Sequence, residues 1–123
     1  MEYTYELHPD LKVLSVRLIG GLYKNDVALI DHEIRLKAKE LNYKIIFDFR
    51  DTSNYMSFGD AYFWFGTNPN NMSMDLIHIP VVHIINEQDD YFFNFFEITS
   101  NNKGARIKTC RDQISAFQWL EKM

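Results

Sequence analysis

The sequence predicts an α/β fold: a five-stranded mixed, mostly parallel sheet with about four helices, in the order β-β-α-β-α-β-α-β-α. Two observations predict it. First, short runs of β-branched and aliphatic residues alternate with longer segments in which apolar residues recur every three or four positions. Second, Gly, Pro and Asn separate these segments. Right-handed crossovers through the helices bring the chain back in the same direction, so most neighbouring strands should be parallel.

The first two strands are expected to form an antiparallel pair. The segment "EYTYEL" alternates, "KVLSVRLIG" is rich in β-branched and aliphatic residues, and the turn residues "HPD" separate them. Gly20 and Gly21 break the second strand, and a helix follows with Asn25 as its cap. The apolar face of that helix comprises Val27, Ile30, Ile34, Ala38 and Leu41, whereas Asp31, Glu33, Arg35, Lys37 and Lys39 are expected mostly on the outside.

The middle of the chain predicts two buried strands and a helix between them. Residues 43–49, "YKIIFDF", are apolar at nearly every position, as in a strand whose sheet is covered on both faces. A second helix should begin near Ser57 and end before "TNPNN", where Pro69 and three Asn stop it. Residues 79–85, "IPVVHII", form the next buried strand.

The last part of the chain predicts a helix, a strand and a final helix. The third helix, "QDDYFFNFFEITSNNKG", starts at Asp89 or Asp90 and stops at Gly104. The fifth strand is "ARIKTC". Thr109 and Asp112 have the spacing of a capping box for the last helix, which is expected to bury Ile114, Phe117 and Leu120.

The composition is typical of one soluble globular domain covering residues 1–123. Apolar residues make up 46% and charged residues 24% of the chain. The net charge of −4 and the scattered Lys and Arg argue against nucleic acid as a partner. A single cysteine, Cys110, allows no internal disulfide, and no signal peptide or membrane-spanning run is evident, so a cytoplasmic location is expected.

Several segments together resemble the SpoIIAA-like proteins. They are the strand pair, the "GG" break, "KIIFDFRD", "VVHIINEQDD" and the closing "AFQWLEK". These proteins are small bacterial relatives of STAS domains and have been likened to the CRAL–TRIO lipid-binding fold. The resemblance covers nearly the whole chain and implies one SpoIIAA-like domain, in a group that mostly lacks an established activity.

The same resemblance draws attention to Ser57. STAS-type antagonists of anti-sigma factors carry Asp-Ser-x-Gly at a helix start, and the serine is phosphorylated. Ser57 and Gly59 match this motif, whereas Met56 stands in place of the acidic residue. The residues themselves favour a helix cap, because Asp60 is placed to close a capping box. A phosphate would gain from the helix N-terminus but meet Asp60 and Asp51, so a phosphorylation switch at Ser57 stays open as the alternative.

Aromatic side chains crowd two helical segments of the chain. A helix that covers a sheet needs an apolar stripe only about 100° wide. Residues 62–65 are four consecutive aromatics, so some rings should point away from the sheet. The expected ligand or interface residues are Tyr55, Phe58, Tyr62, Trp64, Phe65, Tyr91, Phe92, Phe95 and Phe96.

Three partners would cover these rings. A second copy of the chain is favoured, because symmetric homodimers are the commonest assemblies. A small hydrophobic, lipid-like ligand held between the two helices is the alternative that the CRAL–TRIO likeness favours. A membrane surface is the third, although no basic rim accompanies the aromatics. The sequence thus predicts a non-enzymatic protein-interaction or regulatory module, with a ligand carrier or sensor as the runner-up.

Neither a catalytic constellation nor a metal site emerges from the sequence. Asp48 and Asp51 lie near the carboxyl end of a strand, where open α/β sheets bind ligands, and are expected at a pocket rim. His78 and His83 flank Pro80 and would face opposite sides of an extended strand, with no Cys or acidic cluster at ligand spacing. We therefore expect no enzyme, no metal and no cofactor.

Overall fold

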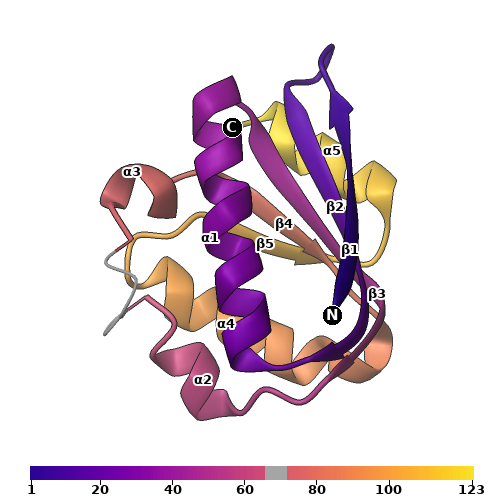
Figure 1. Cartoon of the computed structure of the whole chain (residues 1–123), viewed down its shortest axis with the longest axis vertical. Helices are drawn as coiled ribbons and strands as arrows, with labels where there is room; N and C mark the ends of the chain where they lie inside the picture. The colour runs from indigo at the N-terminus through magenta and orange to yellow at the C-terminus, as the bar shows by residue number, and fades with distance from the viewer. Residues whose placement is uncertain (66–71) are drawn as a thin grey trace.

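The computed structural model describes residues 1–65 and 72–123, which form a five-stranded mixed sheet with five helices. The strands lie side by side in chain order; the first two are antiparallel and the others are parallel (Figure 1). The α/β class and the mixed sheet are therefore as predicted. The strands are β1 (Glu2–His8), β2 (Val13–Leu22), β3 (Lys44–Asn54), β4 (Val81–Ile84) and β5 (Ile107–Cys110). The helices are α1 (Lys24–Leu41), α2 (Phe58–Tyr62), α3 (Met74–Ile77), α4 (Asp90–Asn101) and α5 (Gln113–Glu121), and a 3-10 turn, Glu87–Asp89, precedes α4.

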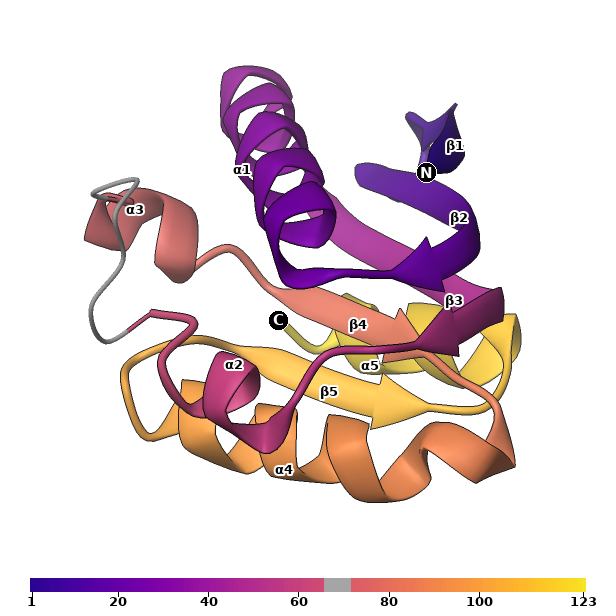
Figure 2. The same ribbon diagram turned by 60° about the horizontal axis from the view of Figure 1, so that its bottom comes forward.

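The two faces of the sheet are covered unequally. Each parallel connection steps to the next strand in the same direction, so right-handed crossovers place their helices on the same face. Accordingly α1, α2 and α4 pack on one face, around a large core, and α2 lies beside α4 (Figure 2). Of the described elements, only α5 covers the other face, around a small core of Val13, Ile46, Val82, Ile84, Ala116 and Leu120.

The apolar run in β3 follows from this arrangement. Ile45, Phe47 and Phe49 point into the large core, while Ile46 points into the small core beneath α5. The strand is longer than predicted and continues to Asn54. Its later residues pair with the end of β2, which carries the chain to the edge where α2 begins.

Helix α1 differs from the prediction at its start and on its outer face. Asn25 is not the cap: the helix begins at Lys24, and Tyr23 takes the capping position in an extended conformation. Asp31 and Arg35, predicted on the outside, are buried with exposed fractions of 6% and 1%. They are buried because α3 and the turn after α2 cover this side of the helix.

Two details of the C-terminal elements also differ. Thr109 does not cap α5, because it still belongs to β5; Asp112 is the cap, and its carboxylate accepts from the Ser115 N–H at 2.7 Å. Ile114, predicted to be buried, is 72% exposed.

The start of α4 after Asp89 agrees with the prediction. The predicted stop of the second helix at Pro69 lies outside the described residues; α2 itself ends at Tyr62.

Candidate functional site

Exposed aromatic rings gather around α2 and the start of α4. Tyr91 is 82% and Tyr55 is 62% exposed, and four further rings are at least partly open to solvent. The rings contact one another in pairs: Tyr23 stacks on Tyr55 at 5.0 Å between centroids, and Phe58 meets Tyr91 edge to face at 5.7 Å. We call this set the aromatic surface; it comprises Tyr23, Tyr55, Phe58, Tyr62, Phe63 and Tyr91.

Local structure explains why these rings face outward. Helix α2 has only five residues, and Phe58 and Tyr62 lie one turn apart on it. One side of the Phe58 ring rests against Phe95 of α4, at 5.1 Å between centroids, so the other side stays exposed. Tyr91 precedes the buried Phe92 at the start of α4, so successive side chains point in different directions.

The predicted interface residues divide into two groups. The rings of Tyr55, Phe58, Tyr62 and Tyr91 are exposed, and Phe95 is half-buried. The chain leaves the helical conformation after Tyr62, and the following turn carries two of the predicted rings inward. Phe92 and Phe96 lie on the buried face of α4. Four predicted residues therefore lie in the large core and contribute nothing to the surface: Trp64, Phe65, Phe92 and Phe96. Tyr23, which the sequence analysis missed, belongs to the surface because it stacks on Tyr55.

Ser57 is the cap of α2. Its hydroxyl oxygen accepts from the Asp60 N–H at 3.1 Å, and the Asp60 carboxylate accepts from the Ser57 N–H at 2.9 Å. The predicted capping box is therefore present. Ser57 is exposed and lies in the chain between Tyr55 and Phe58, within the aromatic surface.

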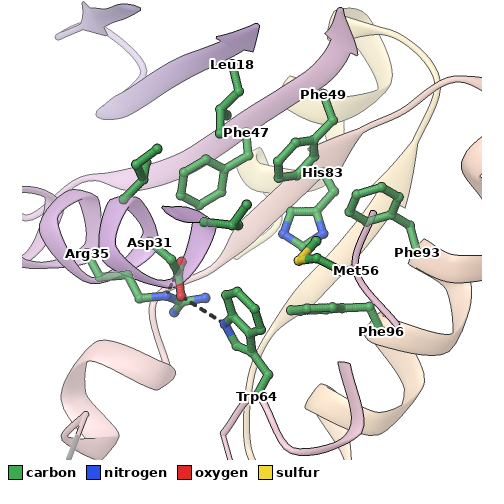
Figure 3. A pocket seen from close by; sticks show the side chains of 12 residues that line it. Leu18, Asp31, Arg35, Phe47, Phe49, Met56, Trp64, His83, Phe93 and Phe96 are labelled. Atoms are coloured by element: carbon green, nitrogen blue, oxygen red, sulfur yellow. Dashed lines mark hydrogen bonds and ion pairs between the residues drawn. The ribbon is translucent and has the colours of Figure 1, made fainter. Parts of the chain in front are cut away.

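A buried ion pair links α1 to the segments around it, and the sequence analysis missed it. The Arg35 Nε donates to the Asp31 carboxylate at 2.8 Å, and the Trp64 indole N–H donates to its second oxygen at 3.2 Å (Figure 3). The Arg35 guanidinium also donates to the carbonyls of Leu76 and Ile77 in α3, at 2.8 and 3.4 Å. The pair thus fastens α1, α3 and the turn after α2 together.

A small cavity lies beside this ion pair (Figure 3). His83 of β4 faces it, surrounded by aromatic rings that include Phe49 and Phe93, and its Nδ1 atom has no hydrogen-bond partner among the described residues. Burial, assisted by the charge of Arg35, lowers the pKa of His83 to about 3, so the imidazole is neutral near pH 7. The free volume is about 20 Å³, which suffices for one water molecule.

The opposite face of the sheet holds a polar groove. It lies where α5 leaves β1, β2 and β3 uncovered, has a volume of about 420 Å³, and is lined in part by Ser15, Arg17 and Asp48. Partial burial raises the pKa of Asp48, but hydrogen bonds from Arg50 outweigh this effect and hold the pKa below its usual value. Asp51 forms an ion pair with Arg17, and both line a second hollow beside Asp48 and Arg50. The two predicted rim residues therefore do border hollows, near the carboxyl ends of the parallel strands.

One serine–histidine contact lies next to this groove. The Ser15 hydroxyl is 3.3 Å from the His8 Nε2. Within the described residues no carboxylate is hydrogen-bonded to His8, whose ring instead meets the edge of Phe117. Ser15 lies in mid-strand between paired strands, where backbone N–H groups are engaged in the sheet. The contact thus has the features of a structural hydrogen bond.

Comparisons with family models, curated proteins and solved structures find no match to this chain. In residues 1–65 and 72–123, no helix combines the length and apolar character needed to cross a membrane. The same residues contain no cluster of three or more His, Cys, Asp or Glu side chains placed to hold a metal ion. The candidate functional site therefore rests on its own geometry, and the aromatic surface is its clearest feature.

Proposed function

We propose that the chain is a non-enzymatic, STAS-like protein-interaction module whose aromatic surface binds a partner protein. The exposure of six rings around α2 and α4 is the observation that carries this proposal. Large exposed apolar patches mark interaction sites, and Tyr and Phe are enriched where protein interfaces are most deeply buried. A partner with an apolar surface of its own fits this chemistry.

The surroundings of the aromatic surface favour a protein over an anionic membrane. Lys103 lies against it, with its Nζ 4.3 Å from the centre of the Tyr62 ring. Binding to anionic lipid requires several basic side chains around the apolar face. Asp60, in the capping box of α2, is acidic, and the charge of Asp90 is balanced by its ion pair with Arg111. The charges described around the rings therefore form no basic rim, which favours a protein partner.

Affinity purification from the protein's own cells tests this proposal with three baits. The wild-type chain is compared with Tyr91→Lys, which alters the most exposed ring, and with Ile114→Lys, an equally drastic change on α5 at the other face of the sheet. We expect a partner that the wild-type and Ile114→Lys baits retain and the Tyr91→Lys bait loses. Circular dichroism confirms that all three baits are folded. Identical protein sets on the three baits would contradict the proposal.

Ser57 offers a way to regulate this contact, as the STAS resemblance implies. A phosphate there would place nearly two negative charges between Tyr55 and Phe58, in the middle of an apolar contact. Replacement of Ser57 by Asp keeps a capping acceptor and adds charge, so we expect weaker retention of the same partner without loss of fold. Unchanged retention would leave Ser57 with the capping role alone.

A ligand carrier or sensor is the second candidate function. The cavity lined by aromatic rings favours it, because the Arg35 side chain and a His83 nitrogen without a partner in the described part of the chain both border it. Because its free volume is close to that of one water molecule, a lipid-like ligand requires the segments that line it, among them α1, α4 and the turn with Trp64, to separate. Native mass spectrometry of protein purified from its own cells distinguishes the two functions: a carrier retains a small hydrophobic mass, and an interaction module does not.

A further inference from the structure

Strand β1 is a long, open edge of the sheet. It spans Glu2–His8, pairs with β2 on one side only, and is exposed along most of its length (Figure 2). The strand at the other edge, β5, has only four residues and is contacted by α4 and α5. An open strand presents unpaired backbone N–H and C=O groups to another chain. In the described residues, no Pro and no bulge interrupts β1.

We propose that two copies of the chain form a dimer through β1, with the two strands antiparallel and Tyr5 facing Tyr5 of the second copy. This pairing joins two five-stranded sheets into one continuous sheet across a two-fold axis. The homodimer expected from the sequence would form through the aromatic rings, whereas the contact proposed here uses β1 and does not involve the aromatic surface. The inference is therefore independent of what that surface binds.

The register follows from the strand itself. In a two-fold antiparallel pair, only the register centred on Tyr5 pairs the whole of Glu2–His8 with its copy. This register places Glu2 opposite His8, Tyr3 opposite Leu7 and Thr4 opposite Glu6. An acidic side chain then meets an imidazole, and an aromatic ring meets an aliphatic chain, which are favourable cross-strand pairs.

The charges disfavour the neighbouring registers. A shift by two residues in one direction places Glu2 opposite Glu6 at both ends of the pairing. A shift in the other direction places Glu6 opposite its own copy on the two-fold axis. Like charges directly opposite each other destabilise a sheet. The centred register avoids both contacts, so charge complementarity and pairing length select the same arrangement.

His8 is prepared for this contact. Its Nε2 atom already shares a hydrogen bond with the Ser15 hydroxyl at 3.3 Å. In the tautomer in which Nε2 accepts from that hydroxyl, Nδ1 carries the proton and is a hydrogen-bond donor. The Glu2 carboxylate of the second copy is the acceptor that the centred register brings opposite.

The flank of the edge toward α1 is apolar enough to support the contact. Tyr5 and Leu7, which share this face of β1, are 51% and 41% exposed. Lys37 of α1 lies over this face, with its Nζ 4.8 Å from the centre of the Tyr5 ring. In the dimer, Tyr5 packs on Tyr5 and Leu7 packs on Tyr3, which removes these side chains from water.

The competing interpretation is that Glu2 and Glu6 protect the edge, since charged side chains keep open strands from pairing. The two interpretations predict different masses in solution. Sedimentation equilibrium of the full chain at micromolar concentrations should give twice the 14.6 kDa chain mass for the dimer. A chain that stays monomeric over this range overturns the proposal.

Two cysteine variants then test the register, both in a Cys110→Ser background so that no other thiol is present. Tyr5→Cys places two thiols opposite each other on the two-fold axis, within the distance that a disulfide spans. Leu7→Cys is the matched control on the same face of the same strand. In the centred register its two copies are offset by four residues along the strand, roughly 13 Å, which is too far for a disulfide.

After mild oxidation we expect disulfide-linked dimers from Tyr5→Cys and at least tenfold fewer from Leu7→Cys. Equal crosslinking of both variants, or a stable dimer that neither variant crosslinks, overturns the proposed contact. The result does not depend on the partner-binding experiment. A monomer that still loses its partner on Tyr91→Lys substitution would remove this inference and leave the interaction function in place.

Discussion

The buried Asp31–Arg35 pair gives the sharpest stability prediction. The Asp31→Asn substitution keeps the size of the side chain and removes its charge. The Arg35 guanidinium, only 1% exposed, then has no counterion, although its bonds to the Leu76 and Ile77 carbonyls remain. Breaking one partner of a buried pair costs about 3–5 kcal/mol, because an uncompensated charge stays in the interior. We expect the free energy of unfolding to fall by about that amount.

Urea unfolding followed by far-UV circular dichroism measures this effect. With a urea dependence of roughly 2 kcal/mol per molar for a domain of this size, the midpoint should fall by about 2 M. The matched control is Asp75→Asn. It breaks the Lys39–Asp75 pair, which also joins α1 to α3 but is largely exposed, and should cost less than about 1 kcal/mol.

The double variant Asp31→Leu/Arg35→Met completes the thermodynamic cycle. It removes both charges together, so no unpaired charge remains in the interior. The remaining loss is that of the hydrogen bonds to the carbonyls of α3 and from the Trp64 indole, each worth about 1 kcal/mol. The loss for the double variant should be clearly smaller than the sum of the losses for the single variants Asp31→Leu and Arg35→Met. The reasoning is refuted if Asp31→Asn costs no more than Asp75→Asn, or if the two single losses simply add.

Three further predictions concern single side chains. His83 takes up a proton near pH 6.5 in the unfolded chain and only at about pH 3 in the folded one. Its contribution to stability is therefore complete above pH 6.5. As the pH falls from 6.5 toward 3, this contribution decreases by about 1.4 kcal/mol per pH unit. Stability measured in urea at several pH values should therefore fall less steeply with acidification in His83→Phe, and parallel profiles would contradict this. Ser57→Ala should lower the free energy of unfolding by about 1 kcal/mol through loss of the α2 cap, whereas Ser57→Asp should stay near wild type in the same assay. Phe93→Ala, deep in the large core, should cost about 3–5 kcal/mol and Tyr91→Ala less than about 0.5 kcal/mol, and similar thermal shifts for the two would show that Tyr91 is not exposed.

The features that the sequence predicted correctly depend on neighbours in the chain. The Ser57–Asp60 capping box needs only two side chains three residues apart and a helix between them. The α/β class depends on the alternation of apolar patterns, which each segment carries by itself. Thr109 shows the limit of such local signals. Its spacing to Asp112 is that of a capping box, but β5 extends through Thr109 and the helix starts later.

The features that the sequence did not reveal depend on distant segments. Charged residues on the outer side of an amphipathic helix normally face water. Asp31 and Arg35 do not, because α3 and the turn containing Trp64 fold over them, and nothing in the pattern of α1 indicates that cover. Trp64 itself was predicted at the surface because the helix was expected to continue past Tyr62. The aromatic surplus was recognised, but which rings stay outside is decided by that early helix end.

The order of strands in the sheet has a consequence for how the protein is made. Each strand pairs with the one synthesised just before it, so no strand has to wait for a later one or slip between two that are already joined. A chain leaving the ribosome can therefore extend the sheet step by step from the first hairpin, with only the connection from the preceding strand to close at every stage. Helix α5 arrives last and closes the opposite face once the strands beneath it are in place.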